Sequence, residues 1–365
     1  MDFEAAKAAG FENLHEVVRQ ARINLNANIW DYLVGGTESE TTLRRNRLAL
    51  DTVAFRPRVL NDVSKVDLTC EFLGKRLDLP VCAAPVGSLE SFHEEGGAAM
   101  VKGCAEAGTA MMLSSVSQPG LEAVAKAAPD ALRIFQLYVR GDTGWIDDIA
   151  KRAIANDYTA FCLTVDTAHY SRRERDIDKR FDKRWRRGDE YMAATQAALS
   201  WSEVERFKGK HDIPLILKGI ATGEDAKIAV EHGVEVVYVS NHGGRQLDHG
   251  RGAMDVLPEV VDAIAGRAKI MVDGSFLRGS DIVKGIAAGA DCIGIGRMAV
   301  AGLAGAGQAG VARVMHLLKH EASICFGLLG VTGWDQLTTA HIHRGAPAVT
   351  DPSVWSAFPL LDSPR

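Results

Sequence analysis

Short apolar runs alternate with amphipathic, helix-like stretches along most of the chain. The apolar runs are continuous, which indicates strands that are buried on both faces and therefore belong to a parallel sheet. Their spacing is typical of repeated strand–helix units. The pattern predicts strands at 80–84, 110–114, 134–139, 161–165, 215–218, 236–240, 270–273 and 292–296, and helices at 97–107, 120–127, 143–155, 223–232, 256–265 and 279–288.

Eight strand–helix units fit two architectures. An open doubly wound sheet could hold them, but eight units favour a closed (β/α)8 TIM barrel, and no G-x-G-x-x-G follows the first strand. Residues 1–60 are predicted to be helical, with a non-helical lead-in at 51–58, and 308–345 to form closing helices before a proline-containing tail. We therefore expect a single domain over 1–365, with its barrel at about 75–305.

Composition indicates an ordinary globular chain. Its 365 residues are 47% hydrophobic and 24% charged, which is enough for a large core and indicates neither disorder nor a fibrous repeat. The net charge of −5 gives no general attraction to nucleic acid. The chain begins with acidic residues and has no long apolar run, so we expect neither a signal peptide nor a membrane span.

The cysteines are scattered, without any C-x-x-C pair, and several lie in apolar runs. This usage predicts buried, reduced thiols, and hence a cytoplasmic protein without disulfides or a metal site.

Polar side chains follow most of the predicted strands. Sites on a barrel are built at the carboxyl ends of its strands, so these residues are candidates for a site. Any one of them could instead be a satisfied polar group of the core, but the set favours a site. They are Ser114, Ser115, Gln136, Tyr138, Thr164, Asp166, Lys218, Ser240, Asn241, His242 and Asp273.

The segment 240–248 has the most specific chemistry. It places His242 and Arg245 three residues apart, directly after the strand-like run 236–239. A base beside a fixed cation suits a substrate that loses a proton while its carboxylate is held. The alternative is a simple turn whose glycines allow positive φ, and this segment alone leaves both interpretations open.

The last two strands are followed by glycine turns with arginines. Gly274 and Ser275 precede Arg278 after the seventh strand, and Gly296 precedes Arg297 after the eighth. Backbone N–H groups and guanidinium groups suit a phosphate, which commonly binds at these two loops of a barrel. The glycines could also serve only to pack helix against strand. We expect a phosphorylated cofactor or substrate here.

Five motifs together carry a family resemblance. The chain resembles the FMN-dependent L-2-hydroxy acid oxidases and dehydrogenases, which include glycolate oxidase, lactate oxidase and mandelate dehydrogenase. The resemblance implies a barrel that uses FMN to oxidise an (S)-2-hydroxy acid to the 2-oxo acid, with O2 or another acceptor reoxidising the flavin. The motifs are S-N-H-G-G-R-Q-L-D at 240–248, F-Q-L-Y-V at 135–139, L-T-V-D-T at 163–167, R-R-E-R-D at 172–176 and L-K-G at 217–219.

The resemblance also implies roles for single residues. His242 is the expected base, Asp166 orients it, Tyr138 binds the oxygen of the reacting carbon, and Lys218 lies beside the flavin. Arg173, Arg245 and Tyr32 are expected to hold the substrate carboxylate, with Val116 near its side chain. The implied FMN contacts are Pro85, Val86, Gly87, Ser114, Gln136, Thr164 and Lys218, with Asp273, Gly274, Ser275, Arg278, Gly296 and Arg297 towards the phosphate.

Without the resemblance, simpler interpretations of three of these residues compete. Tyr32, close to Trp30, could be a hydrophobic staple of an N-terminal helix. Arg173 lies in a charged run typical of a solvated face, and Lys218 could extend from its strand to solvent.

Three positions depart from the family pattern. Val116 stands where glycolate oxidase has tryptophan, which leaves room for a bulkier or more apolar substrate. Gly87 stands where several oxidases have alanine, which leaves the oxidant open. Leu277 replaces an arginine at the phosphate end, so either Arg278 compensates or Arg297 acts with glycine N–H groups alone and FMN binds more weakly.

Other functions remain open at this point. The same scaffold could oxidise an amino acid or a peptide-derived substrate, or bind flavin without catalysis. The basic segment 172–187, with Phe181 and Trp185, is interpreted as a mobile lid in preference to a surface-binding loop. The resemblance further implies a homo-oligomer, a tetramer or an octamer.

Overall fold

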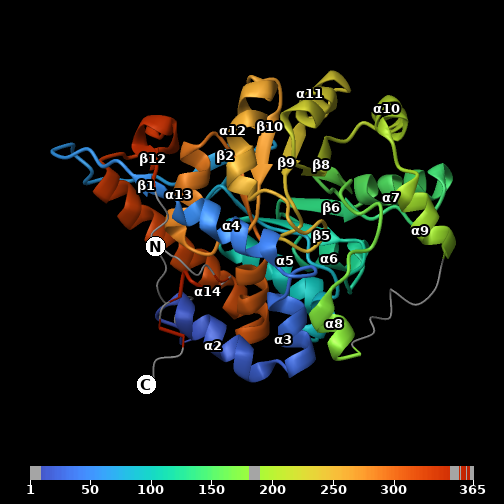
Figure 1. Cartoon of the computed structure of the whole chain (residues 1–365), viewed down its shortest axis with the longest axis horizontal. Coiled ribbons are helices and arrows are strands. Elements are labelled where there is room, and N and C mark those ends of the chain that lie inside the picture. The colour runs from blue at the N-terminus through green and yellow to red at the C-terminus, as the bar shows by residue number, and fades with distance from the viewer. Residues whose placement is uncertain (1–9, 181–189, 346–352, 354, 359, 362–365) are drawn as a thin grey trace.

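The computed structural model describes residues 10–180, 190–345, 353, 355–358 and 360–361. Eight parallel strands close into a barrel around which the helices are arranged (Figure 1), which confirms the predicted (β/α)8 fold. Neighbours around the barrel follow chain order, and β11 closes it against β4. The strands are β4 (Val81–Ala83), β5 (Ala110–Ser114), β6 (Arg133–Leu137), β7 (Ala160–Thr164), β8 (Leu215–Ile220), β9 (Val236–Val239), β10 (Lys269–Val272) and β11 (Cys292–Ile295).

Helices connect the strands near the expected positions. The last of them, α14 (Arg297–Leu329), starts directly after β11, ten or so residues earlier than the sequence pattern indicated. It bends at Ala306 and Gly307, whose backbone angles are not helical. The others are α5 (Gly96–Glu106), α6 (Leu121–Ala127), α7 (Thr143–Ala155), α8 (Glu174–Asp178), α9 (Glu190–Ala197), α10 (Trp201–Lys210), α11 (Gly223–Glu231), α12 (Ala253–Ile264) and α13 (Gly279–Ala287).

Three helices precede the barrel. They are α2 (Leu14–Asn24), α3 (Ala27–Val34) and α4 (Thr41–Asp51), and the side chains of Asn13 and Asn26 cap the first two. Helices α2 and α3 lie against α14, as Figure 1 shows, whereas α4 packs on α12. The described part of the predicted helical segment contains these three helices, which pack against the barrel, whereas residues 1–9 lie outside the described residues.

Two small sheets were missed by the sequence pattern. Strand β1 (Val53–Phe55) pairs antiparallel with β12 (Ile342–Arg344), and β2 (Cys70–Phe72) pairs with β3 (Lys75–Leu77). The prediction of helix up to residue 345 was thus wrong at its end, where short 3-10 turns at Trp334–Gln336 and Thr339–His341 lead into β12. Strands of three residues show too little periodicity to be recognised, and partners far apart in sequence stabilise them.

The interior of the barrel is apolar along most of the strands and polar at their carboxyl ends. Cys82, Met112, Cys162, Tyr238 and Cys292 belong to a buried cluster formed by the strands. Burial of each large apolar side chain contributes about 1.5–3 kcal/mol. Cys70 and Cys325 are half-buried, and the other cysteines are buried with free thiols. Among the described residues, no helix combines the length and apolar character required to cross a bilayer.

Candidate active site

A cavity lies at the carboxyl ends of the strands, and α3 covers part of it. Its position agrees with the usual location of sites on this fold. Helix α3 contributes Tyr32 and Leu33, although it lies outside the barrel in sequence. The remaining lining residues are Ala84, Pro85, Val86, Gly87, Phe92, Val116, Tyr138, Arg173, Lys218, His242, Gly243, Arg245, Asp273, Gly274, Ser275, Phe276, Leu277, Gly294, Gly296 and Arg297.

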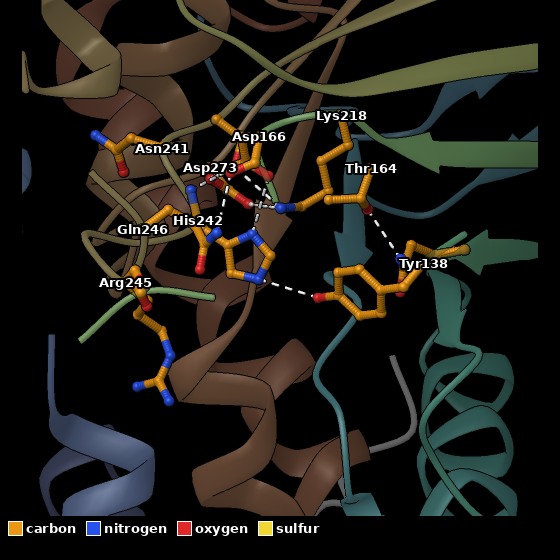
Figure 2. Close-up of polar contacts among 12 residues, drawn as sticks. Tyr138, Thr164, Asp166, Lys218, Asn241, His242, Arg245, Gln246 and Asp273 are labelled. Carbon is orange, nitrogen blue, oxygen red and sulfur yellow. Dashed lines mark hydrogen bonds and ion pairs between the residues drawn. The ribbon is translucent and has the colours of Figure 1, made fainter. Parts of the chain in front are cut away.

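His242 forms the centre of a chain of three side chains (Figure 2). Its Nδ1 lies 3.2 Å from Asp166 Oδ1, and its Nε2 lies 3.0 Å from the hydroxyl oxygen of Tyr138. A carboxylate can only accept, so Nδ1 carries the proton and Nε2 accepts a hydrogen bond from the Tyr138 hydroxyl. The imidazole atom that faces the cavity therefore has a free electron pair available for a proton once Tyr138 moves to a substrate.

Burial has the largest single effect on the pKa values of His242 and Asp166. Desolvation and the nearby Lys218 ammonium lower the pKa of His242 below its usual value, and the Asp166 carboxylate only partly opposes them. The contribution of Asp166 alone raises the pKa of His242, but burial outweighs it. Burial also raises the pKa of the Asp166 carboxyl, yet His242 and Lys218 bring that pKa below its ordinary value. The resting pair is therefore a neutral imidazole beside a carboxylate.

Two arginines lie near this base. Arg245 Nη1 donates to the carbonyl oxygen of Gly35 at 2.6 Å, and Arg173 Nε donates to the Ser171 hydroxyl at 3.3 Å. Burial and the neighbouring Arg173 lower the pKa of Arg245 to about 10. Because these hydrogen bonds go to neutral oxygen atoms, an anion that entered the cavity would relieve the repulsion between the two guanidinium groups.

Tyr32 brings the N-terminal segment into the site. Its hydroxyl donates to the carbonyl oxygen of Gly87 at 3.1 Å, and Arg245 stacks over its ring at 5.0 Å. On its other side the ring stacks against Phe92 at 5.6 Å between centroids. Tyr32 is therefore placed within the cavity and is more than a hydrophobic staple of α3.

A second polar chain lies beneath the cavity. Lys218 Nζ donates to Ser240 Oγ at 3.1 Å, and Ser240 Oγ donates to Asp273 Oδ1 at 2.7 Å. Lys218 is 2% exposed, so it does not extend to bulk solvent. The chain holds a buried cation at the ends of β8, β9 and β10.

The polar ends of β6 and β7 lie beside Lys218 in the barrel, although Gln136, Thr164 and Ser114 are not among the residues that line the cavity. Gln136 Nε2 donates to Thr164 Oγ1 at 2.9 Å, which leaves Gln136 Oε1 buried without a partner among the described residues. Ser114, at the end of β5, accepts a hydrogen bond from Val116 N at 3.4 Å. An unpaired buried oxygen is costly, so Gln136 is suited to a ligand that donates a hydrogen bond.

The loop after β10 lines a further part of the cavity, its second end. Gly274 and Ser275 have φ values of 108° and 64°, and the buried Ser275 hydroxyl has no partner among the residues described. Arg297 Nη2 donates to the carbonyl oxygens of Gly35 and Gly243, each at 3.0 Å. Burial and the nearby Arg245 lower the pKa of Arg297 to about 9. This end also favours an anion.

The sequence of this chain matches that of a known family. A family model described as FMN-dependent dehydrogenase matches residues 21–344. The chain belongs to this family.

Similar relatives include an L-lactate oxidase from Nostoc sp., 37% identical over 91% of this chain and 98% of the relative. Glycolate oxidase 1 from Oryza sativa subsp. indica is also 37% identical, over 96% of this chain and 99% of the relative. A crystal structure of mandelate oxidase with (S)-2-phenylpropionate superposes with a TM-score of 0.84 at 34% identity, covering 92% of this chain and 99% of that one. These relatives confirm the resemblance stated from the motifs.

The cavity fits FMN, the cofactor of the family. The unpaired Gln136 oxygen can accept from the imide of a flavin ring, and the buried Lys218 can offset negative charge on the reduced ring. At the other end, the unpaired Ser275 hydroxyl and Arg297 can bind a phosphate. Pro85, Val86 and Gly87 line the cavity between these ends.

Arg278 does not lie with the other expected phosphate ligands. Its guanidinium forms an ion pair with Glu321 at 2.7 Å and stacks on Phe358 at 5.6 Å. It lines a separate hollow beside Phe55. The structure therefore offers no sign that Arg278 compensates for Leu277, which lines the cavity as an apolar, buried residue.

Some residues of the site were not singled out from the sequence. Phe92 lines the cavity, but no periodicity or motif distinguishes it, because it follows a short 3-10 turn at Leu89–Ser91. Ser240 was noted only as a polar strand end, although it connects Lys218 with Asp273. The basic segment 172–187, predicted to be a mobile lid, includes residues that lie outside the described residues, because 181–189 are not described. Within the described part, Arg175 of α8 pairs with Glu40 and Asp31 of the N-terminal segment.

Proposed function

We propose that this FMN-dependent enzyme oxidises an (S)-2-hydroxy acid with an uncharged, apolar side chain to the 2-oxo acid. The observation that carries the proposal is the position of the base between two arginines and a carboxylate. His242 lies at hydrogen-bonding distance from Asp166, while Arg173 and Arg245 line the same cavity with neutral hydrogen-bond partners. This arrangement can hold a carboxylate while the base accepts a proton from the substrate and the remaining hydrogen and the electron pair pass to the flavin.

Each residue has a defined task in this mechanism. Arg173 and Arg245 bind the substrate carboxylate, and Tyr32 fixes the position of Arg245 through its ring. Tyr138 transfers its hydrogen bond from His242 to the substrate oxygen, and His242 Nε2 then accepts the substrate proton. Asp166 stabilises the resulting imidazolium. Bound FMN supplies a two-electron acceptor for this oxidation.

The walls of the cavity support an apolar side chain on the substrate. Val86, Phe92 and Val116 line it, whereas its charged residues are those assigned to the carboxylate, the base and the cofactor. Val116 leaves more room than the tryptophan of glycolate oxidase. A branched or aromatic 2-hydroxy acid therefore fits this cavity better than glycolate.

Oxidation of an amino acid or a peptide-derived substrate is the alternative on the same scaffold. A substrate without a free carboxylate would not need two buried arginines, and an ammonium group would be repelled by them. A flavin-binding protein without catalysis would have no need of the Asp166–His242–Tyr138 chain. Both alternatives are therefore less well supported.

Four further properties belong to the proposal. The free cysteines support a reducing, cytoplasmic location, and the packing of the N-terminal helices on α12 and α14 supports a single domain over 1–365. A homo-oligomer, tetrameric or octameric, is proposed from the family resemblance. The acceptor that reoxidises the flavin is O2 or another oxidant.

An anaerobic titration tests the function. The purified holoenzyme is mixed with glycolate, lactate, mandelate and a long-chain 2-hydroxy acid in both enantiomers, and the flavin absorbance is recorded before and after air is admitted. We expect the (S)-acids with apolar side chains to bleach the flavin fastest. Recolouring within the turnover time would assign an oxidase, and slow recolouring a dehydrogenase. If amino acids bleach the flavin and no hydroxy acid does, the proposal is wrong.

A further inference from the structure

The catalytic histidine lies in an unusual backbone turn. His242, Gly243 and Gly244 have φ values of 59°, 64° and 76°, so three consecutive residues are in the left-handed region. Glycine adopts this region readily, whereas a histidine there is strained. Strain of this kind persists only where the surrounding contacts fix it. The contacts that hold this turn are therefore of interest for catalysis.

The residue before His242 closes the turn. Asn241 Oδ1 accepts the N–H of Gly244 at 3.1 Å, and Asn241 Nδ2 donates to the carbonyl oxygen of Arg251 at 2.9 Å. The backbone carbonyl of Asn241 also accepts from Gly244 N at 3.1 Å. The position of the Asn241 amide thus determines whether the left-handed turn keeps its shape.

That amide is held from outside the barrel by Asn46 of α4. Asn46 Nδ2 donates to Asn241 Oδ1 at 2.9 Å, and Asn241 Nδ2 donates back to Asn46 Oδ1 at 2.7 Å. Asn46 Oδ1 also accepts the N–H of Ala253 at 3.0 Å, which fixes the orientation of its amide. Asn46 is 0% exposed, so water cannot replace these bonds without an opening of the structure.

Neighbouring residues show that α4 as a whole fixes the loops around the site. Thr42 N donates to Asp248 Oδ1 at 2.8 Å, at the far end of the loop that bears His242. Arg47 Nη1 donates to the carbonyl oxygen of Ser275 at 2.9 Å, on the loop after β10. Asn46 lies between these two and contacts the residue adjacent to His242.

We propose that Asn46 is a positioning residue for the reaction: through Asn241 it holds the left-handed turn that places the His242 ring between Asp166 and Tyr138. The inference rests on the proposed function of His242 as the base. It assigns to the N-terminal helix α4 a part in catalysis that is separate from contact with substrate or cofactor.

A buried amide pair could also serve stability alone, and the test must separate the two roles. The variants are Asn46→Ala, Asn241→Ala and their combination, with Leu50→Ala as the control. Leu50 is buried on the same helix and belongs to the hydrophobic core, so its truncation loosens α4 without touching the loop. Thermal unfolding is measured for each, and rates are compared at a temperature at which all four remain folded.

Flavin reduction by substrate is followed anaerobically by stopped flow. We expect Asn46→Ala to retain the FMN spectrum and to lower the reduction rate at saturating substrate about 10- to 100-fold, because small displacements of a catalytic group have effects of this size. The apparent substrate Kd should change less, since Arg245 is held independently by Gly35. The combined variant should be no slower than the slower single variant, because both act through one contact.

A second measurement does not depend on turnover. With histidine labelled at Cε1, the His242 signal is assigned by its loss in His242→Gln, and it should move in Asn46→Ala but stay in place in Leu50→Ala. An unmoved signal, a rate within twofold of the parent, or Asn46 and Asn241 effects that multiply would each overturn the inference. A moved signal in a protein that no hydroxy acid reduces would instead leave the positioning role intact and refute the proposed function.

Discussion

The two ends of the cavity are built in different ways. At the base end, Asp166, His242 and Tyr138 are joined by side-chain hydrogen bonds, and Arg245 is stacked on Tyr32. At the end formed by the loop after β10, Phe276 and Leu277 are buried apolar residues, and we propose that anion binding depends on Gly274, Ser275 and Arg297. The Arg297 guanidinium reaches this end from beside Arg245, with which it shares the carbonyl oxygen of Gly35. Proton transfer requires particular side chains in particular positions, whereas backbone N–H groups can anchor a phosphate in many sequences. We therefore expect substitutions to have larger effects on rate at the first end and smaller effects on cofactor affinity at the second.

The largest effect should follow from His242→Gln. Glutamine can keep a hydrogen bond to Tyr138 or Asp166 but cannot accept the substrate proton, so reduction of the flavin by substrate should fall by about 10²- to 10⁴-fold. The yellow flavin spectrum should persist, because the cofactor contacts are elsewhere. Anaerobic bleaching at the parent rate would remove His242 from the mechanism.

The next largest effect should follow from a change in the carboxylate clamp, the pair Arg173 and Arg245 proposed to bind the substrate carboxylate. We expect Arg173→Lys to lower kcat/KM about 100-fold, because lysine is a point charge that cannot bind a carboxylate through two parallel hydrogen bonds. Steady-state kinetics with the preferred hydroxy acid measure the effect. Arg172→Lys is the matched control, since Arg172 is 66% exposed and pairs with Glu174 at 2.6 Å. Equal losses in both variants would mean that charge in the loop, and not a clamp, is what matters.

Some residues of the site could be predicted from the sequence and others could not. The base end could be predicted because its residues lie within short motifs that follow buried strands, and strand order alone brings Asp166 and His242 to one face. Asn46 and Phe92 could not be predicted, since their contacts depend on how α4 and the turn after β4 pack on the barrel. Arg278 was misplaced for a related reason: its partner Glu321 lies on α14 and is distant in sequence.

The pH dependence sharpens the comparison within the base end. Burial and Lys218 lower the pKa of His242, so the active neutral imidazole is retained below pH 6.5, and kcat/KM should fall only as pH drops through the lowered pKa. Because the Asp166 carboxylate raises the pKa of His242, Asp166→Asn should move this acidic limb to still lower pH while slowing the reaction. A shift to higher pH would show that the Asp166 carboxylate does not raise the pKa of His242. Profiles of kcat/KM between pH 4 and 8 measure the acidic limb in the parent enzyme and in Asp166→Asn.

The smallest effect is expected at the cofactor end, and it should be a gain. Leu277 is buried and lines the cavity where the family pattern has an arginine. In Leu277→Arg, a second guanidinium beside Gly274 and Ser275 should lower the Kd for FMN about tenfold. A hydrogen bond to a charged group contributes ~1.5–3 kcal/mol, and the cost of burying the new cation near Arg297 reduces this gain. Titration of the apoprotein with FMN and with riboflavin, followed by flavin fluorescence, measures the effect. Riboflavin has no phosphate, so its Kd should stay unchanged, and Leu277→Met should leave both values as they are. Tighter binding of riboflavin would show that the arginine acts on the ring and not on the phosphate. The end formed by the loop after β10 would then not be the phosphate-binding end of the cavity.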